Sequence, residues 1–132
     1  MPFVVDIGIE FSVGDGYLTT AGEVEPRVLR FDGDIHFANA NDVREILFDA
    51  LRNGARDLVI DLSRVEFLDS CAIGVMIKVL KTVQDRGGRL ILAGVNRHIL
   101  KILDITHLNN VLEIRDSVNV ALEELKSSKP AN

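Results

Sequence analysis

Apolar side chains follow two different periods on either side of residue 69. Residues 58–62 form a short apolar run rich in β-branched side chains, which is typical of a strand covered on both faces. From residue 71 to residue 83 the apolar positions recur at helical spacing instead. The polar pair Asp69 and Ser70 separates the two patterns. A buried strand is therefore predicted to lead into a helix that begins at or beside Ser70.

Four other segments have the short apolar or alternating pattern of strands: residues 4–11, 27–31, 89–93 and 111–114. The first is expected to be an edge strand. It is followed by the glycine-rich residues 12–26, which predict turns or a long hairpin. The second strand is expected to end at the turn residues Asp32, Gly33 and Asp34.

Three other segments have helical spacing, and each has a candidate N-cap: Asn41, Asn96, and Asp116 or Ser117. A loop at residues 36–40 precedes the first of these helices, which is expected to end at Gly54. Gly87 and Gly88 are expected to end the Ser70 helix, and the last helix is expected to run through residue 125. Residues 126–132 form a polar tail.

Strands that alternate with helices pair in parallel through right-handed crossovers, whereas the two early strands are expected to be antiparallel. The predicted fold class is therefore α/β, a small mixed β-sheet with about four helices that cover at least one face. The length of 132 residues is typical of one domain, so residues 1–132 are interpreted as a single domain with a variable N-terminal part at residues 1–26.

The formal net charge of −5 argues against a nucleic-acid partner, which would need a basic surface. No apolar run is long enough to cross a bilayer, so direct membrane insertion is not expected. The first residues lack a basic stretch and meet Asp6 and Glu10 early, unlike a signal peptide. We therefore expect a cytoplasmic protein.

Catalytic and cofactor-binding patterns are absent from the sequence. The three histidines, His36, His98 and His107, have no metal-ligand spacing, and no phosphate-binding glycine loop is present. Ser70 resembles a nucleophile elbow only superficially, because Leu68 and Ala72 replace the flanking glycines. We expect no enzyme activity, no metal and no cofactor.

The single cysteine, Cys71, excludes an internal disulfide. At the first turn of a helix its thiol is a candidate redox sensor, but a small buried cysteine is more common, and packing is the favoured interpretation.

Asp69 and Ser70 have two compatible interpretations. The simpler is a helix cap. A serine at a helix N-terminus is also a position where backbone amides and the helix dipole hold a phosphate.

On the same helix Ala72, Val75 and Val79 widen the apolar arc, which is either buried by neighbouring helices or forms an exposed strip that binds a partner.

The segments LVIDLSRVEFLDSCAIGVMIKVL, GGRLILAGVN and ILKILDITHLNNVLEI resemble the STAS domain of anti-sigma-factor antagonists. The resemblance covers residues 28–125, and its most specific part is the D-S-x-x-[LI]-G motif that begins at Asp69. It implies an antagonist that binds an anti-sigma factor, itself a serine kinase, and thereby frees a sigma factor. The kinase phosphorylates the serine of this motif, and a phosphatase restores it.

By this resemblance Ser70 is the phosphorylation site and Asp69 helps to shape it. Gly33 and Asp34 match the family's turn before the first helix, which forms part of the partner surface, and Gly74 matches a family glycine. The expected partner-binding residues are Gly33, Asp34, His36, Asp69, Ser70, Cys71, Ala72, Ile73, Gly74 and Val75.

Some residues depart from the family pattern. Ala72 stands where antagonists usually have glycine, so its methyl group is expected to limit how closely a kinase approaches Ser70. Cys71 replaces a serine, threonine or alanine, and His36 replaces a frequent aspartate. The segment HFANANDVREIL is similar to STAS domains of sulfate-type anion transporters. A regulatory or docking module of an anion transporter or of a multi-protein signalling assembly is therefore the alternative function. Self-association as a homodimer through apolar strips is also an open alternative.

Overall fold

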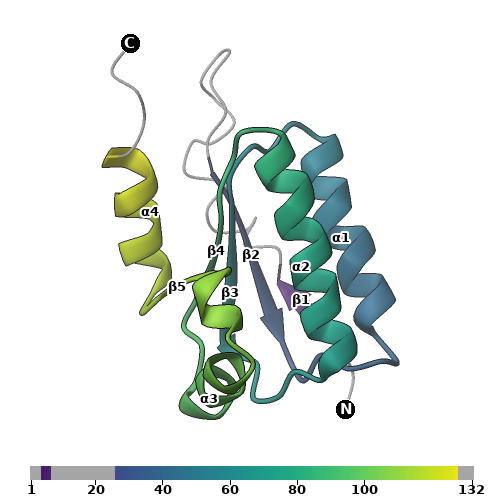
Figure 1. Cartoon of the computed structure of the whole chain (residues 1–132). Coiled ribbons are helices and arrows are strands. Elements are labelled where there is room, and N and C mark those ends of the chain that lie inside the picture. Colours follow the sequence, from purple (N-terminus) through teal and green to yellow (C-terminus); the bar gives the residue numbers. More distant parts are fainter. Residues whose placement is uncertain (1–3, 7–25, 128–132) are drawn as a thin grey trace.

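A computed structural model describes residues 4–6 and 26–127 of the chain (Figure 1). The strands are β1 (Val4–Asp6), β2 (Arg27–Asp32), β3 (Leu58–Arg64), β4 (Leu90–Ala93) and β5 (Glu113–Arg115). The helices are α1 (Ala40–Arg52), α2 (Ser70–Asp85), α3 (Arg97–Ile105), the short 3-10 helix η2 (Leu108–Asn110) and α4 (Val118–Ser127). The strand order is β1-β2-β3-β4-β5. β1 is antiparallel to β2, and the other neighbours are parallel.

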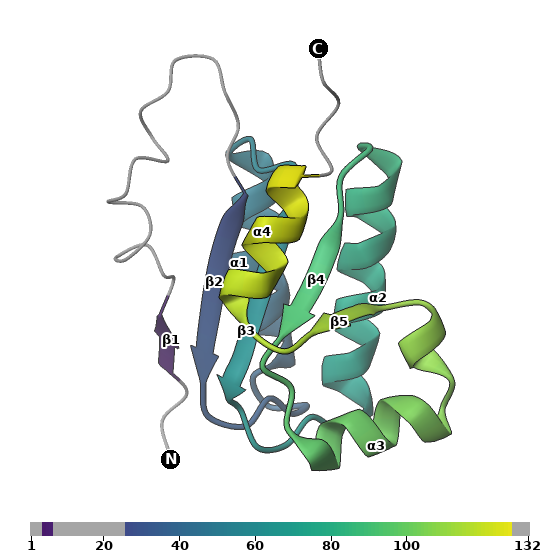
Figure 2. The same ribbon diagram turned by 90° about the vertical axis from the view of Figure 1, so that its left-hand side faces the viewer.

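Helices cover both faces of this mixed sheet. Figures 1 and 2 show α1 and α2 side by side on one face, α4 on the other, and α3 at the end of the sheet where α2 begins. The α/β class, the parallel pairing and the antiparallel entry strand are confirmed. The loops that follow β2 and β3 lie at the same end, because parallel strands direct their carboxyl ends to one edge of the sheet.

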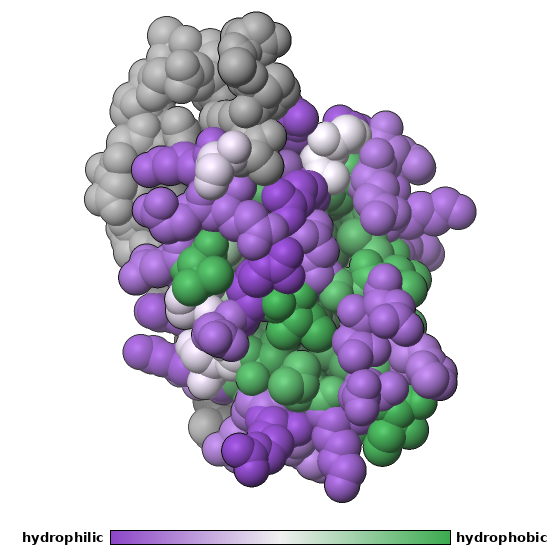
Figure 3. All heavy atoms as spheres, turned by 60° about the vertical axis from the view of Figure 1, so that its left-hand side comes forward, coloured by the Kyte–Doolittle hydropathy of each residue, from purple (hydrophilic) through white to green (hydrophobic). Residues whose placement is uncertain are grey.

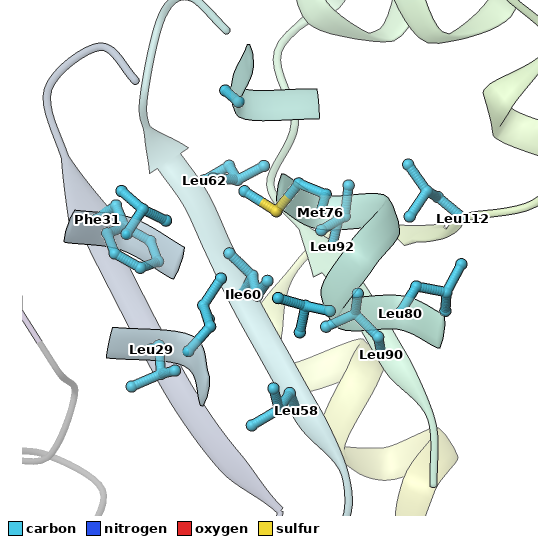
Figure 4. Close-up of a cluster of buried hydrophobic side chains, with 14 of the residues drawn as sticks. Leu29, Phe31, Leu58, Ile60, Leu62, Met76, Leu80, Leu90, Leu92 and Leu112 are labelled. Atoms are coloured by element: carbon cyan, nitrogen blue, oxygen red, sulfur yellow. The ribbon is translucent and has the colours of Figure 1, made fainter. Parts of the chain in front are cut away.

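The central strand β3 is apolar on both faces because each face packs against helices. Leu58, Ile60 and Leu62 point into the larger core with α1 and α2 (Figure 4). Val59 points to the opposite face, where it packs in a smaller cluster with Ala121 of α4. This arrangement explains why the side chains of residues 58–62 are apolar on both faces except at Asp61, rather than alternating between apolar and polar.

Several predicted boundaries are wrong by a few residues. The N-cap of α1 is Asn39 rather than Asn41: the Asn39 carbonyl accepts the N–H of Val43 at 3.1 Å, while its side chain bonds to the preceding loop. The last strand begins at Glu113, after the 3-10 helix, not at residue 111. Of the predicted edge strand, only Val4–Asp6 lies within the described residues. Residues 7–11 and almost all of the predicted hairpin at residues 12–26 lie outside them.

Other predicted helix ends are confirmed. Asp69 is the N-cap of α2, and Asn96 caps α3 by accepting the N–H of Ile99 at 2.8 Å. Of the two candidate N-caps of the last helix, Asp116 and Ser117, Ser117 is the cap, because its hydroxyl accepts the N–H of Val120 at 3.2 Å. Gly54 follows the end of α1 with a φ of +98°.

Four charged residues tie α4 to the edge of the sheet. The Arg89 guanidinium donates to the carboxylates of Glu113 and Glu124. Arg115 donates from Nε to Glu124 Oε1 at 2.6 Å and from Nη2 to Glu113 Oε1 at 3.2 Å. The hydrogen bonds from Arg115 and Arg89 lower the pKa of Glu124 to about 2.

The outer surface is largely hydrophilic on the side that carries α4, with hydrophobic areas between the polar side chains (Figure 3). Within the described part of the chain, no helix has both the length and the apolar character that a membrane crossing requires.

The Glu124 carboxylate makes folding stability sensitive to acid. Its pKa is about 2 in the folded chain, compared with 4.5 for an unperturbed glutamate, so the unfolded chain takes up this proton first as the pH falls. The contribution of this carboxylate to the free energy of unfolding should therefore have its full value above about pH 4.5 and be lost as the pH falls from about 4.5 to about 2. Chemical denaturation of wild type and Glu124→Gln over this range checks the expectation. Parallel pH profiles for the two proteins would contradict it.

Candidate functional site

The carboxylate of Asp69 joins two separate segments at the start of α2. Its Oδ1 accepts the N–H of Ala72 at 3.0 Å, which is the N-cap interaction of the helix. Its Oδ2 accepts the N–H of Phe37 at 2.8 Å, in the loop between β2 and α1. One side chain therefore caps α2 and fixes the neighbouring loop beside it.

Backbone hydrogen bonds hold the same two loops together. Gly33, whose φ is +114°, donates its N–H to the carbonyl of Arg64 at 3.1 Å. Ile35 donates to the carbonyl of Phe67 at 3.1 Å and accepts from the N–H of Asp69 at 3.2 Å. A residue other than glycine would be strained at Gly33. The loop after β2 thus continues the parallel pairing beyond the sheet and lies alongside the residues that lead to Ser70.

Ser70 is the first residue of α2, and its side chain is exposed. Within the described residues its hydroxyl has no hydrogen-bond partner, because the cap of the helix is Asp69. The amides of Ser70 and Cys71 belong to the first turn, which has no preceding turn to accept their hydrogen bonds. The site therefore combines an accessible hydroxyl with free N–H donors at a positive helix end.

An open groove of about 390 Å³ lies between the first halves of α1 and α2, next to Ser70. Its lining residues are Phe37, Ala40, Asn41, Arg44, Cys71, Gly74, Val75 and Lys78. Phe37 is 77% exposed, although it is a large hydrophobic side chain. A solvent-exposed aromatic ring beside a groove is typical of a binding surface.

The structure places many of the predicted partner-binding residues at or beside the groove, but it buries Ala72. Cys71, Gly74 and Val75 line the groove, and Asp69 lies next to it. Ala72 is fully buried in the core, so its methyl group does not face an approaching partner. The expectation that Ala72 narrows access to Ser70 is wrong, because the first turn of α2 directs this position toward the sheet.

Packing is the wrong interpretation for Cys71, because this side chain is exposed. On the apolar arc of α2, Ile73 and Ile77 are half-buried and pack against the core. Val75 is also half-buried, but it lines the groove. Neighbouring elements thus bury most of the arc and leave its edge open near Ser70.

The loop residues Asp34 and His36 take different positions. Asp34 is exposed, and its carbonyl accepts the side-chain amide of Asn39 at 2.9 Å. His36 is half-buried, and its Nδ1 accepts the N–H of Ala38 at 3.2 Å. The sequence patterns did not predict that Phe37 and Arg44 line the groove. An aromatic side chain inside a polar loop was the available signal for Phe37.

The described part of the chain contains no cluster of three or more histidine, cysteine or acidic side chains that could hold a metal ion. The rings of Phe67 and His98 stack with their centroids 6.4 Å apart, so His98 contacts an aromatic ring.

Removal of the Asp69 carboxylate should destabilise both segments that it joins. Asp69→Ala loses a helix cap and a second hydrogen bond, and the free energy of unfolding should fall by about 1–3 kcal/mol. Asp69→Asn, with one acceptor oxygen, should lose less. Denaturation measures the stability, and hydrogen exchange should show faster exchange of the Phe37 amide in Asp69→Ala. An unchanged exchange rate at Phe37 would refute the bridging role.

Comparison with known proteins identifies the family. The sequence model of the STAS domain matches residues 17–121. A Thermotoga neapolitana protein described as a TM1081 homolog is 32% identical over 100 residues, which cover 75% of this chain and 88% of the relative. The anti-sigma F factor antagonist of Paenibacillus polymyxa is 27% identical over 100 residues, 75% of this chain and 86% of the relative.

Solved structures agree with the sequence comparison. The NMR structure of the Thermotoga maritima protein TM1081 is similar with a TM-score of 0.69 and 28% identity, and the match covers 76% of this chain and 82% of that one. An antagonist acts by binding another protein, in agreement with the expectation that this chain is not an enzyme. The chain belongs to the STAS domain family and is a distant relative of anti-sigma factor antagonists.

Proposed function

We propose that this chain is an anti-sigma-factor antagonist whose binding is controlled by phosphorylation of Ser70. It binds an anti-sigma factor with serine kinase activity while Ser70 is unmodified, and it releases that partner when Ser70 carries a phosphate. The observation that carries the proposal is the position of Ser70, an exposed and unbonded hydroxyl beside the groove on α2.

The chemistry of a helix N-terminus supports Ser70 as a phosphoacceptor. An exposed hydroxyl is accessible to a kinase and to a phosphatase. Since Asp69, not Ser70, caps the helix, a phosphate on Ser70 leaves the cap in place. Free amides of the first turn and the helix dipole also favour a phosphate group there. Phosphorylation should therefore change the surface without unfolding the domain.

The effect of that phosphate on a partner is electrostatic. It adds a charge of about −1.5 to −2 next to the Asp69 carboxylate. A partner that covers Ser70 would have to remove water from this charge, and any acidic group on the partner would be repelled. Binding and phosphorylation are thus mutually exclusive states of one surface.

The named relatives support the class of partner. The Paenibacillus polymyxa relative is an antagonist of anti-sigma F factor, and Staphylococcus aureus relatives are antagonists of anti-sigma-B factor. In the proposed complex the partner contacts the start of α2 together with the loop that contains Gly33, Asp34 and His36, which backbone hydrogen bonds hold next to it.

A charge at position 70 should weaken partner binding. Ser70→Asp should reduce the affinity for a purified anti-sigma factor of the same genome by about 2 kcal/mol or more, roughly 30-fold, because the charge enters a desolvated interface. Isothermal titration calorimetry measures the change.

Two variants serve as controls for this measurement. Ser70→Ala should bind like wild type, and so should Ser63→Asp, which places the same charge on an exposed serine away from α2. Equal affinities of Ser70→Asp and wild type would refute the proposal.

A further inference from the structure

Gly74 occupies an unusual place, in the second turn of α2 with no neighbour that requires a glycine. A β-carbon at this position would meet nothing within 4 Å. By contrast, a β-carbon at Gly88 would lie 1.9 Å from the carbonyl oxygen of Arg56, and one at Gly94 would lie 2.9 Å from the Ser63 β-carbon. Packing inside the chain therefore explains Gly88 and Gly94 but not Gly74.

A glycine inside a helix has a cost, because it disfavours the helix relative to alanine. Within the described residues nothing offsets this cost, since Gly74 is exposed and its φ is not in the left-handed region. An absent side chain on an exposed helix face permits another backbone to approach closely. Gly74 thus indicates a close contact with a second molecule.

The surroundings of Gly74 indicate the shape of that molecule. Gly74 lines the groove between α1 and α2. Figure 1 shows these two helices side by side. Val75, Ala40 and the exposed ring of Phe37 give this groove an apolar part. A groove between helices is suited to an amphipathic helix that inserts apolar side chains.

The charge of the groove indicates the chemistry of the occupant. The chain as a whole is acidic, with a net charge of −5, yet the lining contains two cations and no acidic residue. Arg44 forms an ion pair with Glu45, in which the Arg44 Nη2 and the Glu45 Oε2 are 3.3 Å apart. Lys78 has no ion pair within the described residues, so its ammonium group is available to an acidic side chain.

We infer that the groove receives an acidic amphipathic helix of the anti-sigma factor, which crosses α2 over Gly74 and places a carboxylate against Lys78. This inference rests on the proposed function and specifies its partner surface. Ser70 and Gly74 are four residues apart and therefore lie on the same face of α2. A phosphate of about −1.5 to −2 on Ser70 would offset the positive charge of the lining and repel the acidic helix.

Substitution of Gly74 by alanine should raise folding stability and lower the affinity for the partner. Gly74→Ala removes a helix-disfavouring residue, so the denaturant concentration at half-unfolding should rise. The added methyl group blocks the close approach, so affinity for the anti-sigma factor that binds wild type should fall at least about tenfold. A lower midpoint, or an unchanged affinity, would overturn the inference.

Two lysines of α2 test whether the positive charge of the groove contributes to binding. Lys78→Gln should weaken binding about fivefold or more and reduce its dependence on salt, because it removes one ionic contact. Lys81→Gln is the matched control, since Lys81 is exposed on the same helix but does not line the groove. Equal losses in the two variants would overturn the assignment of Lys78.

The outcomes separate this inference from the proposed function. If an anti-sigma factor binds wild type but not Ser70→Asp, while Gly74→Ala and Lys78→Gln bind normally, only the inferred docking groove is wrong. If no anti-sigma factor of the genome binds the wild-type chain, the proposed function fails and this inference fails with it.

Discussion

The arrangement of the site depends on the two hydrogen bonds that the Asp69 carboxylate accepts, from Ala72 in α2 and from Phe37 in the preceding loop. The first begins the helix at Ser70, and the second holds the exposed Phe37 ring beside the same helix. Because Asp69 fills the capping role, the hydroxyl of Ser70 remains exposed. Aspartate is thus the structural member of the pair and serine the accessible one.

The sheet places these groups at one end of the molecule. β2 and β3 are parallel neighbours, so their following loops emerge side by side and extend the pairing through Ile35 and Leu68. The core beneath is continuous from Phe31 to Met76 and anchors α2 against the sheet (Figure 4). A rigid base with exposed loops at the carboxyl edge is a common arrangement for binding sites in α/β proteins. In the proposed function, a change of charge at Ser70 alters this surface and not the base.

Much of the fold could be predicted from the sequence, because its elements have strong local signals. The mostly apolar run of residues 58–62 identified the central strand, and Asp69 identified the start of α2. Predictions failed where two local signals compete. Asparagine is a favoured cap residue and stands at both 39 and 41; the helix begins after Asn39, whose side chain bonds to residues 34 and 36 of the preceding loop. The orientation of the first turn decided that Ala72 is buried and Cys71 exposed, and periodicity did not resolve this. The groove depends on the distance between α1 and α2, which no local pattern contains.

The central claim is that Ser70 carries the switch, and phosphopeptide mass spectrometry of the chain purified from its own cells tests it most directly. Cultures in growth and under stress should be compared, since control of binding by phosphorylation requires that the fraction of chains phosphorylated at Ser70 changes. We expect a phosphate on Ser70 in at least one condition, with a different occupancy in the other. A chain that is unmodified at Ser70 in every condition, while it still binds an anti-sigma factor, would contradict the account.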